Sequence, residues 1–148
     1  MGHTSLRTWT AAALLAVLLL APGCSKPRFT YAPVEGIVTL DGQPLVTGRV
    51  IFAPQPDGTN DGQTGKLSFG VTDQKGHFTL ESVGGDKGAR VGPHLVAILG
   101  EVRDEANPEK IIKREYLPAR YYEGKTLTFA VPADGTTQAN FELVSDKK

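Results

Sequence analysis

Short stretches that alternate apolar and polar residues recur from residue 34 to residue 144, and turn signals separate them. Alternation with a period of two is typical of strands that bury one face of a sheet. Asp41-Gly42 and Asp134-Gly135 illustrate the turns, because Gly adopts positive φ without strain. No convincing amphipathic helix interrupts the pattern. The sequence therefore predicts an all-β fold, an antiparallel seven-stranded β-sandwich. Its strands are expected at 34–40, 48–53, 67–72, 77–83, 94–99, 126–131 and 138–144.

The same alternation assigns the predicted core. Residues 94–99 are apolar on both faces, which predicts a central strand. The polar stretch 103–114 is expected to form a loop or a single helical turn, with Ile111 and Ile112 inside. The other inward positions are Val34, Gly36, Val38, Leu40, Val50, Phe52, Phe78, Leu80, Leu127, Phe129, Val131, Phe141 and Leu143.

An apolar segment precedes all of these strands. His3 and Arg7 give a weakly basic start, and 11–20 is a stretch of ten apolar residues. A helix of that length would measure roughly 15 Å, about half of the hydrocarbon core of a bilayer. The segment therefore has the form of a secretory signal rather than of a transmembrane helix. We expect a signal peptide over residues 1–23.

Cys24 is the only cysteine of the chain, so it lacks a partner for a disulfide and companions for a metal site. Gly23-Cys24, at the end of the apolar segment, resembles the lipobox of bacterial lipoproteins, from which Ala21 and Pro22 depart. The resemblance implies cleavage before Cys24 and attachment of a diacylglycerol to its thiol. The alternative is an ordinary signal peptide followed by a chance cysteine.

The remaining chain is long enough for one domain with a core. Residues 24–33 lack periodicity and are expected to form a short tether, and residues 34–145 to form the β-sandwich domain. The whole chain carries 16 basic and 16 acidic residues. Without a clearly basic face, nucleic-acid binding is not expected. A single cysteine also excludes a fold held together by disulfides.

Six segments of the predicted domain follow one another in a recognisable order: 33–45, 48–54, 72–80, 88–92, 117–121 and 140–143. Together they resemble the carboxypeptidase regulatory-like (transthyretin-like, prealbumin-like) β-sandwich family. More narrowly, they are similar to the small lipoprotein versions common in planctomycete-type bacteria. The resemblance implies a β-sandwich and no particular reaction, because such sandwiches are accessory or binding modules in most settings.

Candidate catalytic groups are few. His77 and His94 lie on separate predicted strands without a paired motif, which favours one solvated and one half-buried histidine over a metal site. Residues 57–62 resemble the start of a calcium loop, but Ser68 stands where a bidentate glutamate is expected, which favours a plain polar loop. No Gly-x-Ser-x-Gly motif is present. We therefore expect no enzyme, no metal site and no cofactor beyond the lipid on Cys24.

One cluster combines aromatic and basic residues near the predicted fifth connection. Such a cluster can stack on a sugar ring or contact a partner, and it can equally pack a loop onto the edge of the sandwich. The residues that could contact a ligand or a partner are Tyr116, Arg120, Tyr121 and Tyr122.

Taken together, these patterns predict a lipid-anchored, non-catalytic β-sandwich with a binding or scaffolding role in the bacterial cell envelope. The protein would be secreted across the inner membrane and held by its lipid on the periplasmic or cell-surface face of a membrane. Its partners would be that membrane and an envelope protein or glycan. The alternative is a carbohydrate- or peptide-binding module that uses the Tyr116–Tyr122 loop.

Overall fold

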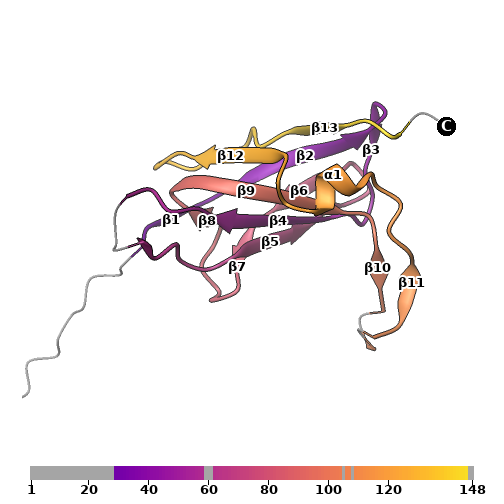
Figure 1. Cartoon of the computed structure of the whole chain (residues 1–148), viewed down its shortest axis with the longest axis horizontal. Helices are drawn as coiled ribbons and strands as arrows, with labels where there is room; N and C mark the ends of the chain where they lie inside the picture. The colour runs from indigo at the N-terminus through magenta and orange to yellow at the C-terminus, as the bar shows by residue number, and fades with distance from the viewer. Residues whose placement is uncertain (1–28, 59–61, 105, 108, 147–148) are drawn as a thin grey trace, which may run out of the picture.

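The computed structural model describes residues 29–58, 62–104, 106–107 and 109–146. These residues form an all-β sandwich (Figure 1), as the sequence predicts. Its elements are β1 (Tyr31–Ala32), β2 (Glu35–Leu40), β3 (Gln43–Pro44), β4 (Arg49–Pro54), β5 (Ser68–Val71), β6 (His77–Thr79), β7 (Glu81–Ser82), β8 (Ala89–Arg90), β9 (Gly92–Leu99), β10 (Val102–Arg103), β11 (Ile111–Lys113), α1 (Ala119–Tyr122), β12 (Leu127–Val131) and β13 (Phe141–Leu143).

The two layers differ in size and regularity. One layer is an antiparallel five-stranded sheet in the order β12-β9-β4-β5-β7. In it, β9 pairs with β4 on one side and with β12 on the other, which confirms the predicted central strand. The second layer is built around β2, which pairs with β13, β3 and β6. β2, β4, β5, β9 and β13 each bury one row of residues between the layers.

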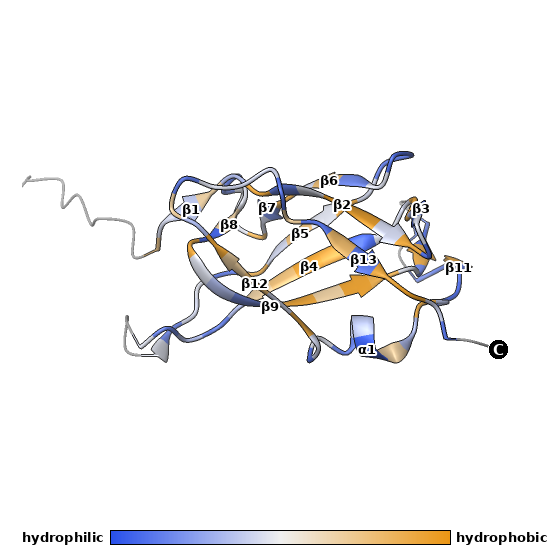
Figure 2. Cartoon of the chain, turned by 90° about the horizontal axis from the view of Figure 1, so that it is seen from above, coloured by the Kyte–Doolittle hydropathy of each residue, from blue (hydrophilic) through white to orange (hydrophobic). Residues whose placement is uncertain are grey.

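The core fills this space. Hydrophobic residues, orange in Figure 2, follow β4 through the middle of the molecule. The alternation assigned the core well, because most predicted inward side chains are buried, and Leu40, Leu127 and Phe129 pack partly buried against them. The predicted inward side chains that are buried are Val34, Val38, Val50, Phe52, Phe78, Leu80, Val131, Phe141 and Leu143.

One pairing differs from the predicted antiparallel arrangement. β13 runs parallel to β2, with Phe141 opposite Val38 and Leu143 opposite Leu40. The chain leaves β12 in the five-stranded sheet, turns at 132–135 and crosses to the other layer. An antiparallel neighbour needs a reversal within one layer, whereas this crossing brings β13 alongside β2 in the same direction.

The prediction for Ile111 and Ile112 is wrong. They lie in β11, which pairs only with β10 in a two-stranded hairpin, and their exposed fractions are 42% and 62%. A two-stranded hairpin has no second layer to cover its apolar side chains. The hairpin leaves the end of β9 and extends beyond the sandwich (Figure 1).

The predicted tether also needs correction. β1 lies within it and pairs with β8, Tyr31 opposite Arg90 and Ala32 opposite Ala89. Ala32 is 2% exposed and belongs to the core. The segment shows no period in the sequence because two paired residues are too short to display one. Among the described residues, no helix has the length and apolarity needed to cross a bilayer.

The contact between β2 and the start of β13 depends on Gly36. The Ala139 N–H donates to the carbonyl of Glu35 at 3.0 Å, which brings the incoming chain across Gly36. A Cβ on Gly36 would lie 2.0 Å from the carbonyl oxygen of Ala139. Any side chain there would therefore displace backbone rather than a movable neighbour.

We expect Gly36→Ala to lower the free energy of unfolding by about 3 kcal/mol, at the upper end for overpacking, because the contact is with backbone. Thr39→Ala, at a half-buried position of the same strand that faces no backbone, is the control and should change stability by less than about 1 kcal/mol. Urea unfolding measures both variants. Equal midpoints for the two would contradict the close approach at Gly36.

Candidate functional site

A buried arginine organises the end of the sandwich at which the described chain begins. Arg90 in β8 is 3% exposed, and arginine is rarely buried without partners. Its Nη1 donates to the carbonyl oxygens of Gln55 and Thr64, both at 3.1 Å, and its Nη2 pairs with the carboxylate of Asp57. The guanidinium thereby fastens both ends of the loop between β4 and β5.

The same cluster holds the segment that precedes β1. The Cζ atom of Arg90 lies 5.0 Å from the centre of the Phe29 ring, a cation–π arrangement. The Tyr31 hydroxyl accepts a hydrogen bond from the Lys66 N–H at 3.0 Å. Residues 29–32 therefore belong to the folded domain, and the rest of the predicted tether lies outside the described residues.

Asp57 is the first residue of the segment that resembles a calcium loop. Residues 59–61 lie outside the described residues, so the loop as a whole is not placed. The Asp57 carboxylate is paired with Arg90, which competes with a metal for its oxygens. This pairing favours the predicted plain polar loop.

Two of the predicted contact residues at 116–122 make their hydrogen bonds within the chain. Tyr121 is 8% exposed, and its hydroxyl accepts from the Val144 N–H at 3.0 Å and lies 3.3 Å from the Val144 carbonyl. Arg120 donates to the Val144 carbonyl and to the Asp146 carboxylate. Tyr121 and Arg120 therefore tie α1 to the segment after β13, which favours the packing interpretation for this pair.

Tyr116 and Tyr122 are the two predicted contact residues whose side chains remain exposed to solvent, with exposed fractions of 40% and 38%. The Lys113 Nζ lies 3.7 Å from the centre of the Tyr116 ring, so it covers one face of that ring. Tyr122 is thus the aromatic side chain of this cluster with the most freedom to meet a ligand.

Glu115 holds the loop and the β10–β11 hairpin together, and the sequence analysis did not single it out. Its carboxylate accepts backbone N–H groups from Gly100 at 2.9 Å, Tyr116 at 2.9 Å and Leu117 at 2.8 Å, and from Glu101 at 3.2 Å. A carboxylate that accepts several N–H groups fixes the chain on both sides of it. No local sequence pattern indicates this role, because the Gly100 and Glu101 donors are about 15 residues away in the chain. Arg90 could have been noticed, since it is a charge flanked by Ala89 and Val91.

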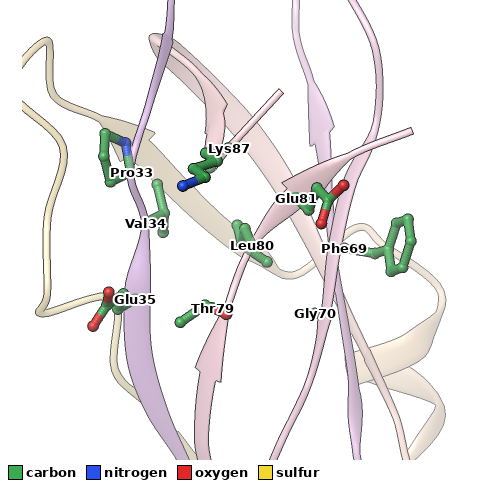
Figure 3. Close-up of a pocket in the computed structure, with 10 residues that line it drawn as sticks. Pro33, Val34, Glu35, Phe69, Gly70, Thr79, Leu80, Glu81 and Lys87 are labelled. Carbon is green, nitrogen blue, oxygen red and sulfur yellow. The ribbon is translucent and has the colours of Figure 1, made fainter. Parts of the chain in front are cut away.

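A cleft of about 480 Å³ opens where the edges of the two layers part (Figure 3). It lies between β2 and the β5–β7 edge of the five-stranded sheet. Glu35 and Glu81 stand on different walls, and Lys87 lies at one end near Val34. General acid–base catalysis requires such groups to converge on one reacting atom. These two carboxylates instead border the cleft separately.

The two histidines lie on different layers and in different surroundings. The His77 side chain is 42% exposed, with Nε2 3.4 Å from the Glu35 carboxylate, as an outward position predicts. His94 is 2% exposed rather than half-buried, because Pro54 and Phe129 flank it on neighbouring strands. The surface pocket beside His94 does not include His77. The described residues hold no group of three or more His, Cys, Asp or Glu placed to bind a metal.

Burial lowers the pKa of His94 below its ordinary value of 6.5, and the charge of Arg90 acts in the same direction. Its Nδ1 lies 3.0 Å from the Gly92 carbonyl, so this nitrogen carries the proton of the neutral ring. Nε2 is buried with no hydrogen-bond partner among the described residues. The folded state therefore resists protonation of this ring.

No protein-family model matches the chain, and no curated protein matches it. Among solved structures it is similar to a 9R-lipoxygenase from Cyanothece PCC8801, with 16% identity over 90% of this chain and a TM-score of 0.34. The chain spans 19% of the length of that structure. So low a TM-score carries no argument about fold or activity.

We expect the free energy of unfolding to fall as the pH drops from 7 toward 5, because the unfolded chain protonates His94 below about pH 6.5 while the folded chain does not. His94→Gln should remove this slope. His77→Gln, at the exposed histidine, is the control and should keep it. Urea titrations at a series of pH values measure the slope, and an unchanged slope in His94→Gln would overturn the assignment.

Tyr121→Phe should lower the free energy of unfolding by about 1–2 kcal/mol, because the Val144 N–H loses its acceptor. Tyr122→Phe, which keeps an exposed ring in the next position, should stay within about 0.5 kcal/mol of the wild type. Thermal unfolding compares the two variants. If both behaved alike, the hydroxyl of Tyr121 would have no packing role.

Proposed function

We propose that the protein is a lipid-anchored, non-catalytic β-sandwich of the bacterial cell envelope, with a binding or scaffolding role on the periplasmic or cell-surface face of a membrane. The observation that carries this proposal is the position of the only cysteine. Cys24 follows Gly23 directly, at the end of a short apolar segment and just before the folded domain. A cysteine needed for a disulfide or for packing would lie within the domain.

The chemistry at Cys24 would be attachment rather than redox. Its thiol would lose its proton, and the sulfur would displace the phosphate headgroup of a diacylglycerol phospholipid to form a thioether. Hydrolysis of the peptide bond before Cys24 would then remove residues 1–23. Each buried CH₂ of an acyl chain contributes about 0.8 kcal/mol, and one chain alone holds a protein only weakly. Two or more chains on one residue would give a stable anchor.

The fold supports an anchored domain with a short tether. Five residues lead from Cys24 to Phe29, a span of at most roughly 17 Å. The Arg90 cluster holds Phe29 and β1 against the sandwich, so the domain would stay close to the bilayer. In Figure 1, β1 and β8 lie at the opposite end of the long axis from α1, β10 and β11. The hairpin end would thus face away from the membrane.

The non-catalytic part of the proposal rests on the arrangement of the polar side chains. Arg90 binds two backbone carbonyls and the carboxylate of Asp57, Glu115 binds backbone N–H groups, and Arg120 binds the chain after β13. The carboxylates at the cleft stand apart. The described polar groups therefore hold loops rather than form a reactive set.

The alternative, a carbohydrate- or peptide-binding module, would depend on Tyr116 and Tyr122. Both are exposed. Tyr122 belongs to α1 and Tyr116 lies between β11 and α1, and these elements are at the end that would face away from the anchor. Tyr121 and Arg120 would then support the site instead of contacting the ligand. This alternative keeps the lipid anchor. It differs from the main proposal only in that it names the surface that would bind a ligand.

Expression of the full chain in a bacterial host with a labelled fatty acid tests the anchor. We expect label in the wild-type protein and none in Cys24→Ser, which should also leave the membrane fraction. Ser25→Ala, at the neighbouring position, is the control and should be labelled normally. A wild-type protein that is soluble and unlabelled would refute the proposal.

A further inference from the structure

The outer face of the five-stranded sheet is apolar. On β5 and just before it, Leu67, Phe69 and Val71 point outward, with exposed fractions of 48%, 45% and 54%. An antiparallel sheet with one face in water normally carries polar residues on that face. A contiguous apolar patch of this kind marks a surface that meets another molecule.

The register extends this patch across the sheet. Ile51 lies opposite Phe69 on one side and opposite Ala97 on the other, and all three point away from the core. Ala53 and Leu95 form a neighbouring pair. We call the apolar outward side chains of β4, β5 and β9, together with Leu67 just before β5, the apolar face; it comprises Ile51, Ala53, Leu67, Phe69, Val71, Leu95, Ala97 and Leu99.

Two opposite charges stand on the apolar face. Arg49 lies opposite Val71 on β4, and Glu81 lies opposite Phe69 on β7. Both are exposed, and neither makes an ion pair with another described residue. A partner that covers the face must pair both charges, because an unpaired buried charge is costly.

We infer that the apolar face is the contact surface of a homodimer, in which a second copy of this chain packs through the same face. In a two-fold contact, Arg49 of each copy meets Glu81 of the other, so the contact contains two Arg–Glu ion pairs. β5 lies between β4 and β7, so its outward Phe69 and Val71 separate the two charges and would pack at the centre of the contact. The face is thus complementary to itself in charge.

This charge pattern favours a second copy over a bilayer. An anionic lipid surface would attract Arg49 and repel Glu81, whereas a second copy pairs both. Face-to-face packing of two sheets, about 10 Å apart, is a common way to bury such surfaces. The inference does not depend on the lipid anchor, since the face belongs to the folded domain.

Sedimentation equilibrium of the full chain, in a detergent matched in density to the solvent, measures the dimer. We expect Arg49→Glu and Glu81→Arg each to raise the dissociation constant at least about tenfold, because each leaves like charges facing. The double variant Arg49→Glu/Glu81→Arg should restore the affinity. Phe69→Ser should weaken the dimer while leaving the charges in place.

Lys75→Glu and Glu142→Arg change exposed charges outside the apolar face and are the controls. They should leave the dissociation constant unchanged, and thermal unfolding checks that every variant is folded. A monomer at all concentrations would overturn the inference. A dimer unaffected by both single charge reversals would also overturn it, because its contact would lie on another surface.

Discussion

Phe141 is the residue through which the two layers of the sandwich meet. Its ring lies 6.1 Å from that of Phe52 and 6.2 Å from that of Phe129 on the five-stranded sheet, and 6.5 Å from that of Phe78 on the other layer. Aromatic pairs at such distances add stabilisation beyond the area they bury. Because Phe141 belongs to β13, the core is complete only when the last strand has docked beside β2.

Two buried or half-buried charged side chains, one at each end of the molecule, hold loops that the core does not fix. Arg90 fixes the loop after β4 and the segment before β1, and Glu115 fixes the base of the hairpin and the start of the 116–122 loop. Each replaces water at backbone groups that no sheet satisfies. The loops at the two ends of the sandwich are thereby held in place.

Much of the fold could be predicted from the sequence, because the alternation of apolar residues records which side of each strand is buried. Phe52, Phe78 and Phe141 are assigned in this way. The same reasoning wrongly places Ile111 and Ile112 inside, because apolarity alone does not reveal whether a second layer is present to cover a hairpin. His94 is more buried than predicted, because its burial depends on strands β4 and β12 that are distant in sequence.

The sequence by itself determined the all-β class, most of the inward positions and the position of Cys24 at the end of the apolar segment, because each of these is a local pattern. Only the tertiary structure decided that β13 runs parallel to β2 and that Tyr121 and Arg120 form hydrogen bonds with the chain after β13. It also decided that Arg49 and Glu81 share one apolar face. These arrangements join residues far apart in the chain. The physical reason is that pairing and burial between distant segments depend on the whole packed core, which no local pattern encodes.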